Sequence, residues 1–552
     1  MTFIRSALLA LCCLVSIQNF ASVPVWYAPT DNIIPTGSQA LQSGSAPTTP
    51  IYLASSNQLV LIWSATNHHL YYATYDGTSW SAPADQAIPL GASTSTYYAI
   101  PIYDPSSEQI VLIWQDISNK NLYYSTYNGT TWSTPDDNAI PLEASGAPTY
   151  PNNPIYDPSS EQVVLVWNTN TLLYYSTFDG TSWTTPASNQ LPLGASTGID
   201  NDTLPSVVYD ASSEQLVQIW LDSGDFSNMY YATYDGTSWS ASGSNQIPTG
   251  DSTGPYSESI GNPMYDPASE QVIIVWYDTD NLLYYASYNG TTWAAPGGNQ
   301  IPLGSSSGIG SYSYSDPVSD PSSSQVVITW QDSSLSAIFY ATYNGTTWTA
   351  PDGNQIPLGS SSGTYTAKDP FFDSAFDQLL QMWQDSATQK LYYAAYDGSS
   401  WSAPSDNMIP LGVATGVSGF STPPGYDPST SQVIELWSDP ATYYYAVYGI
   451  YTPPNPPVVT PAAPASFSGR VTNTNFLTQT NRIYRLFWTP ANDSTVVRYL
   501  LRRNGFLIYT GPAGGPYNYS DNNRNKKVTD VYTLTSQNQN GVESTALTVT
   551  FR

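Results

Sequence analysis

The stretch QLVLIWSATNHHLYYATYDGTSW, residues 58–80, is the strongest sequence signal for the fold of this protein. An apolar run ends in Trp63 and a Tyr-rich run ends in Tyr75, and each has the length and composition of a β-strand. The Asp76-Gly77 pair that follows is a strong sequence signal for a tight β-hairpin turn. The stretch therefore predicts three consecutive antiparallel strands.

The same phrase recurs along most of the chain. The strand that ends in Trp occurs eight times, at intervals of 51 to 56 residues: Trp63, Trp114, Trp167, Trp220, Trp276, Trp330, Trp383 and Trp437. A period near 53 residues with this aromatic pattern predicts the blades of a β-propeller. No segment shows a sustained helical period, so we expect an all-β protein.

One repeat is read as four short antiparallel strands. They are expected at 101–104, 109–114, 122–127 and 130–135. The turn DPSSEQ after the first strand has Asp and Pro where a type I turn favours them. A long connection over 136–153 then leads to the next repeat.

The ends of the repeat array predict how the ring closes. The pattern [DN]G[ST][ST]W occurs seven times and is missing from the eighth repeat, whereas VWYAPTDNIIPTG from Val25 resembles SWSAPSDNMIPLG from Ser400. We therefore expect the N-terminal strand, with Trp26 beside Tyr443 to Tyr445, to complete the last blade and cover its open edge. This gives an eight-bladed propeller, or a seven-bladed one if one repeat is degenerate.

The Trp residues of the fourth strands are predicted to be structural. Large rings fill the wedge between neighbouring sheets, and each buries on the order of 150–250 Å². The residues are Trp26, Trp80, Trp132, Trp183, Trp239, Trp293, Trp348 and Trp401.

The two ends of the chain predict further segments. Residues 1–21 have the basic residue, apolar run and small final residue of a secretory signal peptide, cut after Ala21. Lipidation at Cys12 or Cys13 is the weaker alternative. The propeller is assigned to 22–450, a Pro-rich linker to 451–464 and a β-sandwich to 465–552. We expect a secreted, extracellular or cell-surface protein, with no membrane insertion and a monomeric state.

Charge separates the two folded segments. Residues 22–453 carry 38 acidic residues and only three basic ones, Lys120, Lys368 and Lys390, a net charge of −35. The other ten basic residues after the signal segment all follow residue 454. A body this acidic repels nucleic acid, so no nucleic-acid partner is expected.

Two family resemblances follow from these motifs. The phrase TYDGTSW resembles the Asp-box of BNR, sialidase-like propellers, with one residue fewer between Asp and Gly. That resemblance implies a structural turn around Asp76, Asp179, Asp235 and Asp397. The ring has no arginine, so it lacks the triad that sialidases use to hold a carboxylate.

The C-terminal segment resembles a fibronectin type III domain. The residues that carry the resemblance are Trp488, Tyr499 before RRNG, and Tyr532 as the tyrosine corner. The resemblance implies a spacer or protein-contact module. No RGD sequence is present to suggest integrin binding.

One repeated side chain is a candidate for ligand binding. An aspartate stands two residues after the Trp in six repeats, on the face that the long connections share: Asp116, Asp222, Asp278, Asp332, Asp385 and Asp439. A ring of carboxylates beside hydroxyl and aromatic groups suits sugar binding, and oxygen-only Ca²⁺ sites are chemically allowed. The alternative is that each aspartate caps the backbone of its own hairpin.

Catalytic constellations are scarce. His68 and His69 are adjacent and are expected in an exposed loop, and no nucleophile elbow or phosphate-binding loop is present. Six acidic residues stand at positions where the other repeats have none, and none has an evident second carboxylate to form a catalytic pair: Glu143, Asp200, Asp202, Asp225, Asp251 and Glu258. The sequence thus favours a non-enzymatic, multivalent, lectin-like propeller that binds glycans and has no cofactor. A divergent glycoside-cleaving enzyme and a protein-binding scaffold or adhesin are the alternatives.

Overall fold

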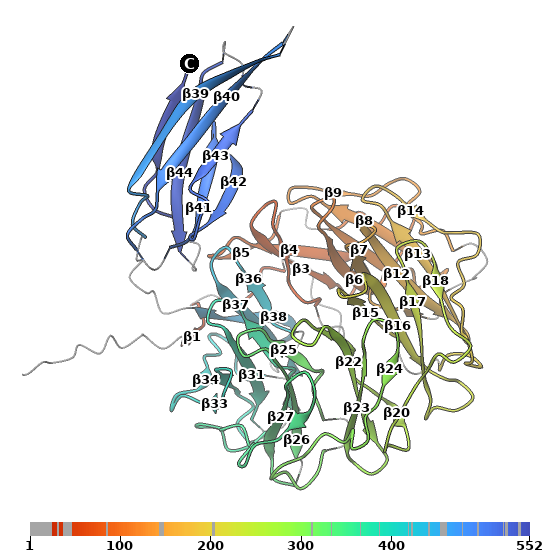
Figure 1. Ribbon diagram of the computed structural model, residues 1–552. Helices are drawn as coiled ribbons and strands as arrows, with labels where there is room; N and C mark the ends of the chain where they lie inside the picture. Colours follow the sequence, from red (N-terminus) through yellow and green to blue (C-terminus); the bar gives the residue numbers. More distant parts are fainter. Residues whose placement is uncertain are drawn as a thin grey trace, which may run out of the picture. The chain divides into compact units, whose positions relative to one another are not determined.

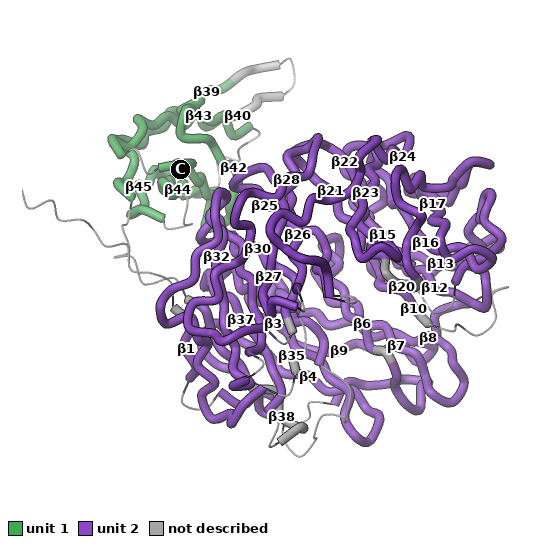
Figure 2. The backbone as a smooth tube through the Cα atoms, turned by 90° about the horizontal axis from the view of Figure 1, so that it is seen from below, with its two compact units in different colours: residues 1–23, 453–552 green, residues 24–452 purple. Residues whose placement is uncertain are grey.

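The computed structural model is all-β, as expected. It describes residues 25–29, 32–36, 47–83, 87–142, 148, 150–200, 205–310, 313–332, 334–364, 366–385, 387–417, 419–420, 423–439, 442–452, 461–476, 479–493, 496–522, 524, 528–538 and 543–552. The chain divides into a ring unit, Pro24–Thr452, and a C-terminal unit that begins at Pro453 (Figure 2). The predicted signal peptide lies outside the described residues. No helix in the described part of the chain is long and apolar enough to cross a membrane.

The ring unit consists of eight antiparallel sheets within the described residues, which confirms the eight-bladed propeller (Figure 1). The blades are numbered 1–8 in the order of their Trp strands. The first strands are β2 (Ile51–Leu53), β6 (Tyr97–Asp104), β10 (Tyr150–Pro151) with β11 (Ile155–Asp157), β15 (Ser206–Asp210), β20 (Pro255–Ile260) with β21 (Met264–Asp266), β25 (Val318–Asp320), β29 (Thr366–Ala367) with β30 (Phe371–Asp373), and β35 (Gly419–Phe420) with β36 (Gly425–Asp427).

The second and third strands form the centre of every sheet. The second strands are β3 (Gln58–Ser64), β7 (Gln109–Gln115), β12 (Gln162–Thr169), β16 (Gln215–Leu221), β22 (Gln271–Asp278), β26 (Gln325–Asp332), β31 (Gln378–Gln384) and β37 (Gln432–Asp439). The third strands are β4 (Leu70–Tyr75), β8 (Leu122–Tyr127), β13 (Leu172–Phe178), β17 (Met229–Tyr234), β23 (Leu283–Tyr288), β27 (Ala337–Tyr343), β32 (Leu391–Tyr396) and β38 (Thr442–Thr452). Their apolar residues are buried on both faces, because every sheet packs between two others.

The fourth strands are short. Blades 1–7 use β5 (Trp80–Ser81), β9 (Trp132–Ser133), β14 (Trp183–Thr184), β18 (Trp239–Ser240), β24 (Trp293–Ala294), β28 (Trp348–Thr349) and β33 (Trp401–Ser402), and blade 8 uses β1 (Val25–Tyr27). Two further short strands, β19 (Gln246–Ile247) and β34 (Met408–Ile409), pair with third strands. First strands of neighbouring blades approach one another, for example β2 and β6, so they form the inner wall of the ring.

The ring is closed by β1, but at a different place on β38 from the one expected. Trp26 pairs with Tyr451, and Val25 and Tyr27 pair with Thr452 and Ile450. The expected neighbours, Tyr443 to Tyr445, lie near the other end of β38. The reason is register: Trp437 pairs with Val447, so Tyr451 holds the place that Tyr75 has in blade 1. The ring unit also continues to Thr452, two residues beyond the expected boundary.

Aromatic rings link each blade to its neighbour. Trp401 lies 5.3 Å from Tyr396 of its own blade and 6.1 Å from Tyr340 of the preceding blade. Trp26 repeats this arrangement, at 5.2 Å from Tyr451 and 6.2 Å from Tyr393. The fourth-strand Trp side chains are buried, except that Trp132 is partly exposed.

The C-terminal unit is a sandwich of two antiparallel sheets. One sheet has the order β39-β40-β43 and the other has the order β42-β41-β44-β45. The strands are β39 (Ser466–Phe476), β40 (Gln479–Thr489), β41 (Val496–Arg503), β42 (Phe506–Pro512), β43 (Asn518–Asp521), β44 (Asp530–Asn538) and β45 (Leu547–Phe551).

The tyrosine-corner prediction needs correction. Tyr532 donates its hydroxyl to the carboxylate of Asp521 at 2.5 Å, and not to backbone. The backbone amide of Ala491 donates instead to the hydroxyl of Tyr499. The sandwich agrees with the expected architecture, whereas membership of the fibronectin type III family stays a prediction.

Candidate functional site

The six aspartates that follow the second-strand Trp residues are buried, with exposed fractions between 0% and 6%. Asp116 shows why. Its carboxylate accepts hydrogen bonds from Ser93 Oγ at 2.8 Å and Thr94 N at 2.7 Å, both on the connection that enters blade 2. It also accepts from Ser118 N at 2.8 Å, in the following turn. Each carboxylate is thus held by loop backbone and hydroxyl groups.

In five blades the same carboxylate belongs to a buried Trp–Ser–Asp contact. In blade 2, Trp114 Nε1 donates to Ser93 Oγ at 3.0 Å, and Ser93 Oγ donates onward to Asp116. The equivalent trios are Trp220–Ser196–Asp222, Trp276–Ser252–Asp278, Trp330–Ser306–Asp332 and Trp383–Ser361–Asp385. In blade 8, Thr415 Oγ1 donates to Asp439 at 2.7 Å.

These hydrogen bonds favour the ionised carboxylates. Burial alone would raise the pKa of Asp116, but donors from Thr94, Ser93, Ser118 and Asn119 lower it to about 2. The pKa values of Asp222, Asp278, Asp332 and Asp385 are lowered in the same way. The geometry favours the alternative in which each aspartate caps backbone groups. The capped groups belong both to the turn after the aspartate and to the connection that enters the same blade. Sugar contact by these side chains stays a prediction.

The opposite face of the ring carries clefts between neighbouring blades. The cleft between blades 4 and 5 has a volume of about 460 Å³, and the one between blades 2 and 3 about 350 Å³. The first is lined by Ser212, Ser213, Ser269, Glu270, Gln271, Asn289, Gly290 and Thr291. The second is lined by Ser106, Ser107, Ser160, Glu161, Gln162, Asp179, Gly180 and Thr181. In both clefts, the turn between the first and second strands of one blade faces two turns of the next blade. These are the turn between its first and second strands and the turn between its third and fourth strands.

The protons of cleft hydroxyl groups are engaged in hydrogen bonds to oxygens of neighbouring turn residues. Ser213 Oγ donates to Asp210 Oδ2 at 2.6 Å, and Thr291 Oγ1 donates to Asn289 Oδ1 at 2.8 Å. Ser107 Oγ donates to Asp104 Oδ2 at 2.6 Å in the other cleft. The oxygens therefore present lone pairs to the cleft, beside the carboxylate of Glu270 or Glu161. The clefts are rich in hydrogen-bond acceptors.

A glutamate in these turns has an unusual backbone conformation. Glu108, Glu161, Glu214 and Glu270 have φ values of +54° to +55°, the left-handed region that favours Gly and Asn. All four side chains are exposed. The corresponding residues of the other blades are Asn57, Ser324, Asp377 and Ser431. The sequence motif DPSSEQ did not single out these glutamates, because Glu at this position carries no signal for a left-handed backbone.

A half-buried tyrosine lies beside each of these clefts. Burial, together with the nearby carboxylates of Asp210 and Glu270, raises the pKa of Tyr265. Tyr156 has an equivalent environment, with Asp104 and Glu161 close by. The phenols thus stay neutral at any physiological pH.

A separate polar chain follows the inner wall from blade 4 to blade 7. Ser206 Oγ donates to Asn262 Oδ1 at 2.9 Å, Asn262 Nδ2 donates to Asp316 Oδ2 at 2.7 Å, and Asp316 N donates to Asp369 Oδ1 at 3.2 Å. Burial raises the pKa of Asp369 to about 6.

Beside this chain lies a fully buried carboxylate. Glu435 has no hydrogen-bond partner for either oxygen among the described residues, and burial raises its pKa to about 8 against the attraction of Lys368. No three His, Cys, Asp or Glu side chains in the described part of the chain lie close enough together to hold a metal ion.

The remaining candidates from the sequence do not gather at one place. His68 and His69 lie exposed in the turn between β3 and β4. The carboxylate of Asp225 accepts a hydrogen bond from Ser227 N, and the carboxylate of Asp251 accepts one from Gly298 N at 2.7 Å. Asp200 is buried. Glu143, Asp202 and the side chain of Glu258 lie outside the described residues.

No protein-family model and no curated protein matches the sequence. Solved structures with a similar fold include the lectin of Aleuria aurantia in complex with Fucα1-6GlcNAc, at 18% identity and a TM-score of 0.33 over 59% of this chain and 100% of that one. The BP39L lectin of Burkholderia pseudomallei has 13% identity and a TM-score of 0.42 over 66% of this chain and 99% of that one. A fungal alcohol oxidase of the AA5 family, in complex with copper, has 12% identity and a TM-score of 0.44 over 96% of this chain and 99% of that one. At this level of similarity the neighbours bear on the fold alone.

Proposed function

We propose that the ring is a multivalent carbohydrate-binding protein whose binding sites are the clefts between its blades. The observation that carries the proposal is the recurrence of one acceptor-rich cleft, built from the same turn residues, between blades 2 and 3 and between blades 4 and 5. A sugar presents a dense set of hydroxyl donors, which is the complement of this lining.

Size and repetition support the same proposal. Volumes of about 350 and 460 Å³ lie within the range of small-molecule sites, about 300–1,000 Å³. Several weak sites on one rigid ring engage a branched or polymeric glycan together, and linkage of this kind raises overall affinity by about 10²–10⁴. With the predicted signal peptide, this function belongs outside the cell or at its surface.

The test replaces the cleft carboxylates Glu161 and Glu270, together with their counterparts in the turns of blades 2 and 4, with a residue that the fold already accepts. Ser324 and Ser431 adopt φ values of +56° and +58° at the equivalent turn positions, so E108S/E161S/E214S/E270S is expected to fold. Wild-type and variant proteins are compared on a glycan array that includes neutral, amino, acidic and fucosylated glycans. We expect saturable binding by the wild type and at least a ~10-fold loss in the variant, through lost avidity.

A charge-matched control separates cleft chemistry from overall charge. Asp136, Asp137, Asp352 and Asp406 are exposed on the connections, away from the clefts. D136N/D137N/D352N/D406N removes the same four charges and should bind like the wild type. Equal loss in both variants, or no saturable glycan binding by the wild type, would contradict the proposal. Release of a cleaved sugar would favour the enzyme alternative.

A further inference from the structure

Exposed apolar side chains concentrate in the C-terminal unit. Phe506 is 78% exposed, the largest value among the exposed large hydrophobic residues of the described chain, and Leu507 beside it is 55% exposed. Val528 and Val531 are 47% and 36% exposed. Exposed apolar patches mark surfaces that meet a protein or a membrane.

Phe506, Leu507 and Val531 lie around one hairpin turn, and Val528 precedes Val531 by three residues in the chain. Phe506 pairs with Arg503 across the β41–β42 turn. Asn504 N donates to Val531 O at 2.7 Å, and Val531 N donates to Asn504 Oδ1 at 2.9 Å, which holds the start of β44 against the turn. We call Phe506, Leu507, Val528 and Val531 the apolar tip.

The apolar tip lies in the half of the sandwich away from the point where the chain enters it, the half in which the longer β39–β40 hairpin continues to the pair Phe476–Gln479. Ala462 N donates to Asp493 Oδ2 at 2.8 Å, and Ser536 Oγ donates to Ala462 O at 2.5 Å, next to the start of β41. The tip adjoins Arg503, at the end of β41.

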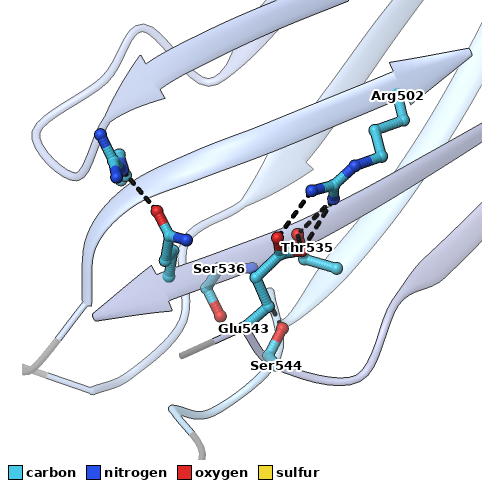
Figure 3. A network of polar contacts seen from close by, with 7 residues as sticks. Arg502, Thr535, Ser536, Glu543 and Ser544 are labelled. Carbon is cyan, nitrogen blue, oxygen red and sulfur yellow. Dashed lines mark hydrogen bonds and ion pairs between the residues drawn. The ribbon is translucent and has the colours of Figure 1, made fainter. Parts of the chain in front are cut away.

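The sandwich is also basic, with ten basic and four acidic residues in 465–552 and a net charge of +6. Part of this charge is paired: Arg502 contacts Glu543 at 2.6 Å (Figure 3), and Arg503 contacts Asp521 at 2.7 Å. Arg470 and Arg485 differ from these. They are exposed and stand directly opposite each other on β39 and β40, and no ion pair joins either to an acid among the described residues.

Two like charges opposite each other destabilise a sheet unless an anion lies between or above them. Arg470 also lies over the exposed ring of Phe487, 5.3 Å from its centroid. This pair belongs to the half of the sandwich near the tip, because Arg485 pairs with Ser520, and the next residue, Asp521, contacts Arg503.

We propose that the apolar tip inserts into the interfacial region of an anionic lipid bilayer, while the arginines of the same half bind the headgroup phosphates. Apolar side chains buried at that depth, supported by basic residues, give reversible surface binding without a membrane-spanning segment. A stable protein interface needs about 800 Å² from each partner, more than four side chains on a convex turn supply. The ring, with a net charge of −35, is repelled by such a surface.

The experiment uses the full chain and sedimentation with two kinds of vesicle, phosphatidylcholine alone and phosphatidylcholine mixed with phosphatidylglycerol. We expect binding to the mixed vesicles, weakened by added salt, and at least a ~10-fold loss for F506S/L507S. R470Q/R485Q should weaken binding to the mixed vesicles as well. A control variant, L335S/V413S, removes two ring side chains that are 53% and 47% exposed and should bind like the wild type.

Thermal unfolding of every variant verifies that the fold is kept, which is expected because Phe506 and Leu507 are exposed. Equal binding of wild type and F506S/L507S to the mixed vesicles would overturn the proposal. So would equal binding of the wild type to neutral and anionic vesicles, or capture of a soluble protein through the tip without vesicle binding. None of these results depends on glycan binding by the ring.

Discussion

The centroid of the indole ring of Trp26 lies 5.2 Å from that of the phenol ring of Tyr451, although the two residues stand at opposite ends of the propeller sequence. Across a normal hairpin, Trp401 and Tyr396 lie 5.3 Å apart in the same way. The closing contact therefore reproduces the contact of an ordinary blade without a turn to connect it. Three residue pairs hold β1 to β38.

Removal of the Trp26 side chain should lower the stability and protease resistance of the propeller more than removal of Trp401, which lies within an ordinary blade. Both W26A and W401A remove a buried indole side chain, which should lower the free energy of unfolding by about 3–5 kcal/mol. In W26A the short N-terminal strand is also released, which exposes the edge of β38. Denaturant unfolding and limited proteolysis near Val25 measure both effects. A W26A protein as stable and as protease-resistant as the wild type would show that β1 is dispensable.

A pair of glycine variants tests the packing of the connections. Gly304 has φ +61°, and a Cβ at this residue would lie 2.5 Å from Asn354 Oδ1. Gly353 has φ +73° with open space around it. G353A should cost about 1–2 kcal/mol from its backbone conformation, and G304A a further ~1–3 kcal/mol from the clash. Equal thermal stabilities of the two variants would mean that the Asn354 contact moves freely.

The Asp116 hydrogen bonds predict a loss of stability in acid. The folded pKa of about 2 lies below the unfolded value of about 3.9, so this contribution is present above about pH 4 and is lost as the pH falls toward 2. D116N should cost about 1–3 kcal/mol at pH 7 and show less acid sensitivity. The exposed Asp136 provides the control, because D136N should change stability by less than about 0.5 kcal/mol. Chemical unfolding at several pH values measures this, and parallel curves for wild type and D116N would refute it.

Glu435 predicts the opposite pH dependence. Its folded pKa of about 8 lies above the unfolded value of about 4.3, so the folded state retains a proton that the unfolded state releases, and stability falls as the pH rises from about 5 to 8. In E435Q this decline should be shallower. Glutamine fits the position, since Gln381 occupies it in blade 7 and donates to Lys368 O at 2.5 Å. An unchanged slope would mean that another group controls stability in this range.

Much of the ring could be predicted from the sequence because its information is local. The strand lengths, the Asp-Gly turns and the period of about 53 residues indicate each blade within a short window, and the copy of the fourth-strand phrase at Val25 indicates closure. The contact partner of Trp26 was wrong because β38 lacks the hairpin motif that sets the register elsewhere.

Repetition and composition in the sequence were enough to predict the fold class, the eight repeats and the charge difference between the ring and the C-terminal unit. The folded chain was needed to show that Ser93 donates to Asp116, 23 residues later, and that Ser213 and Thr291 line one cleft. Which groups a side chain meets depends on how neighbouring blades stack. That stacking places residues from different repeats side by side, and no pattern within a single repeat records it.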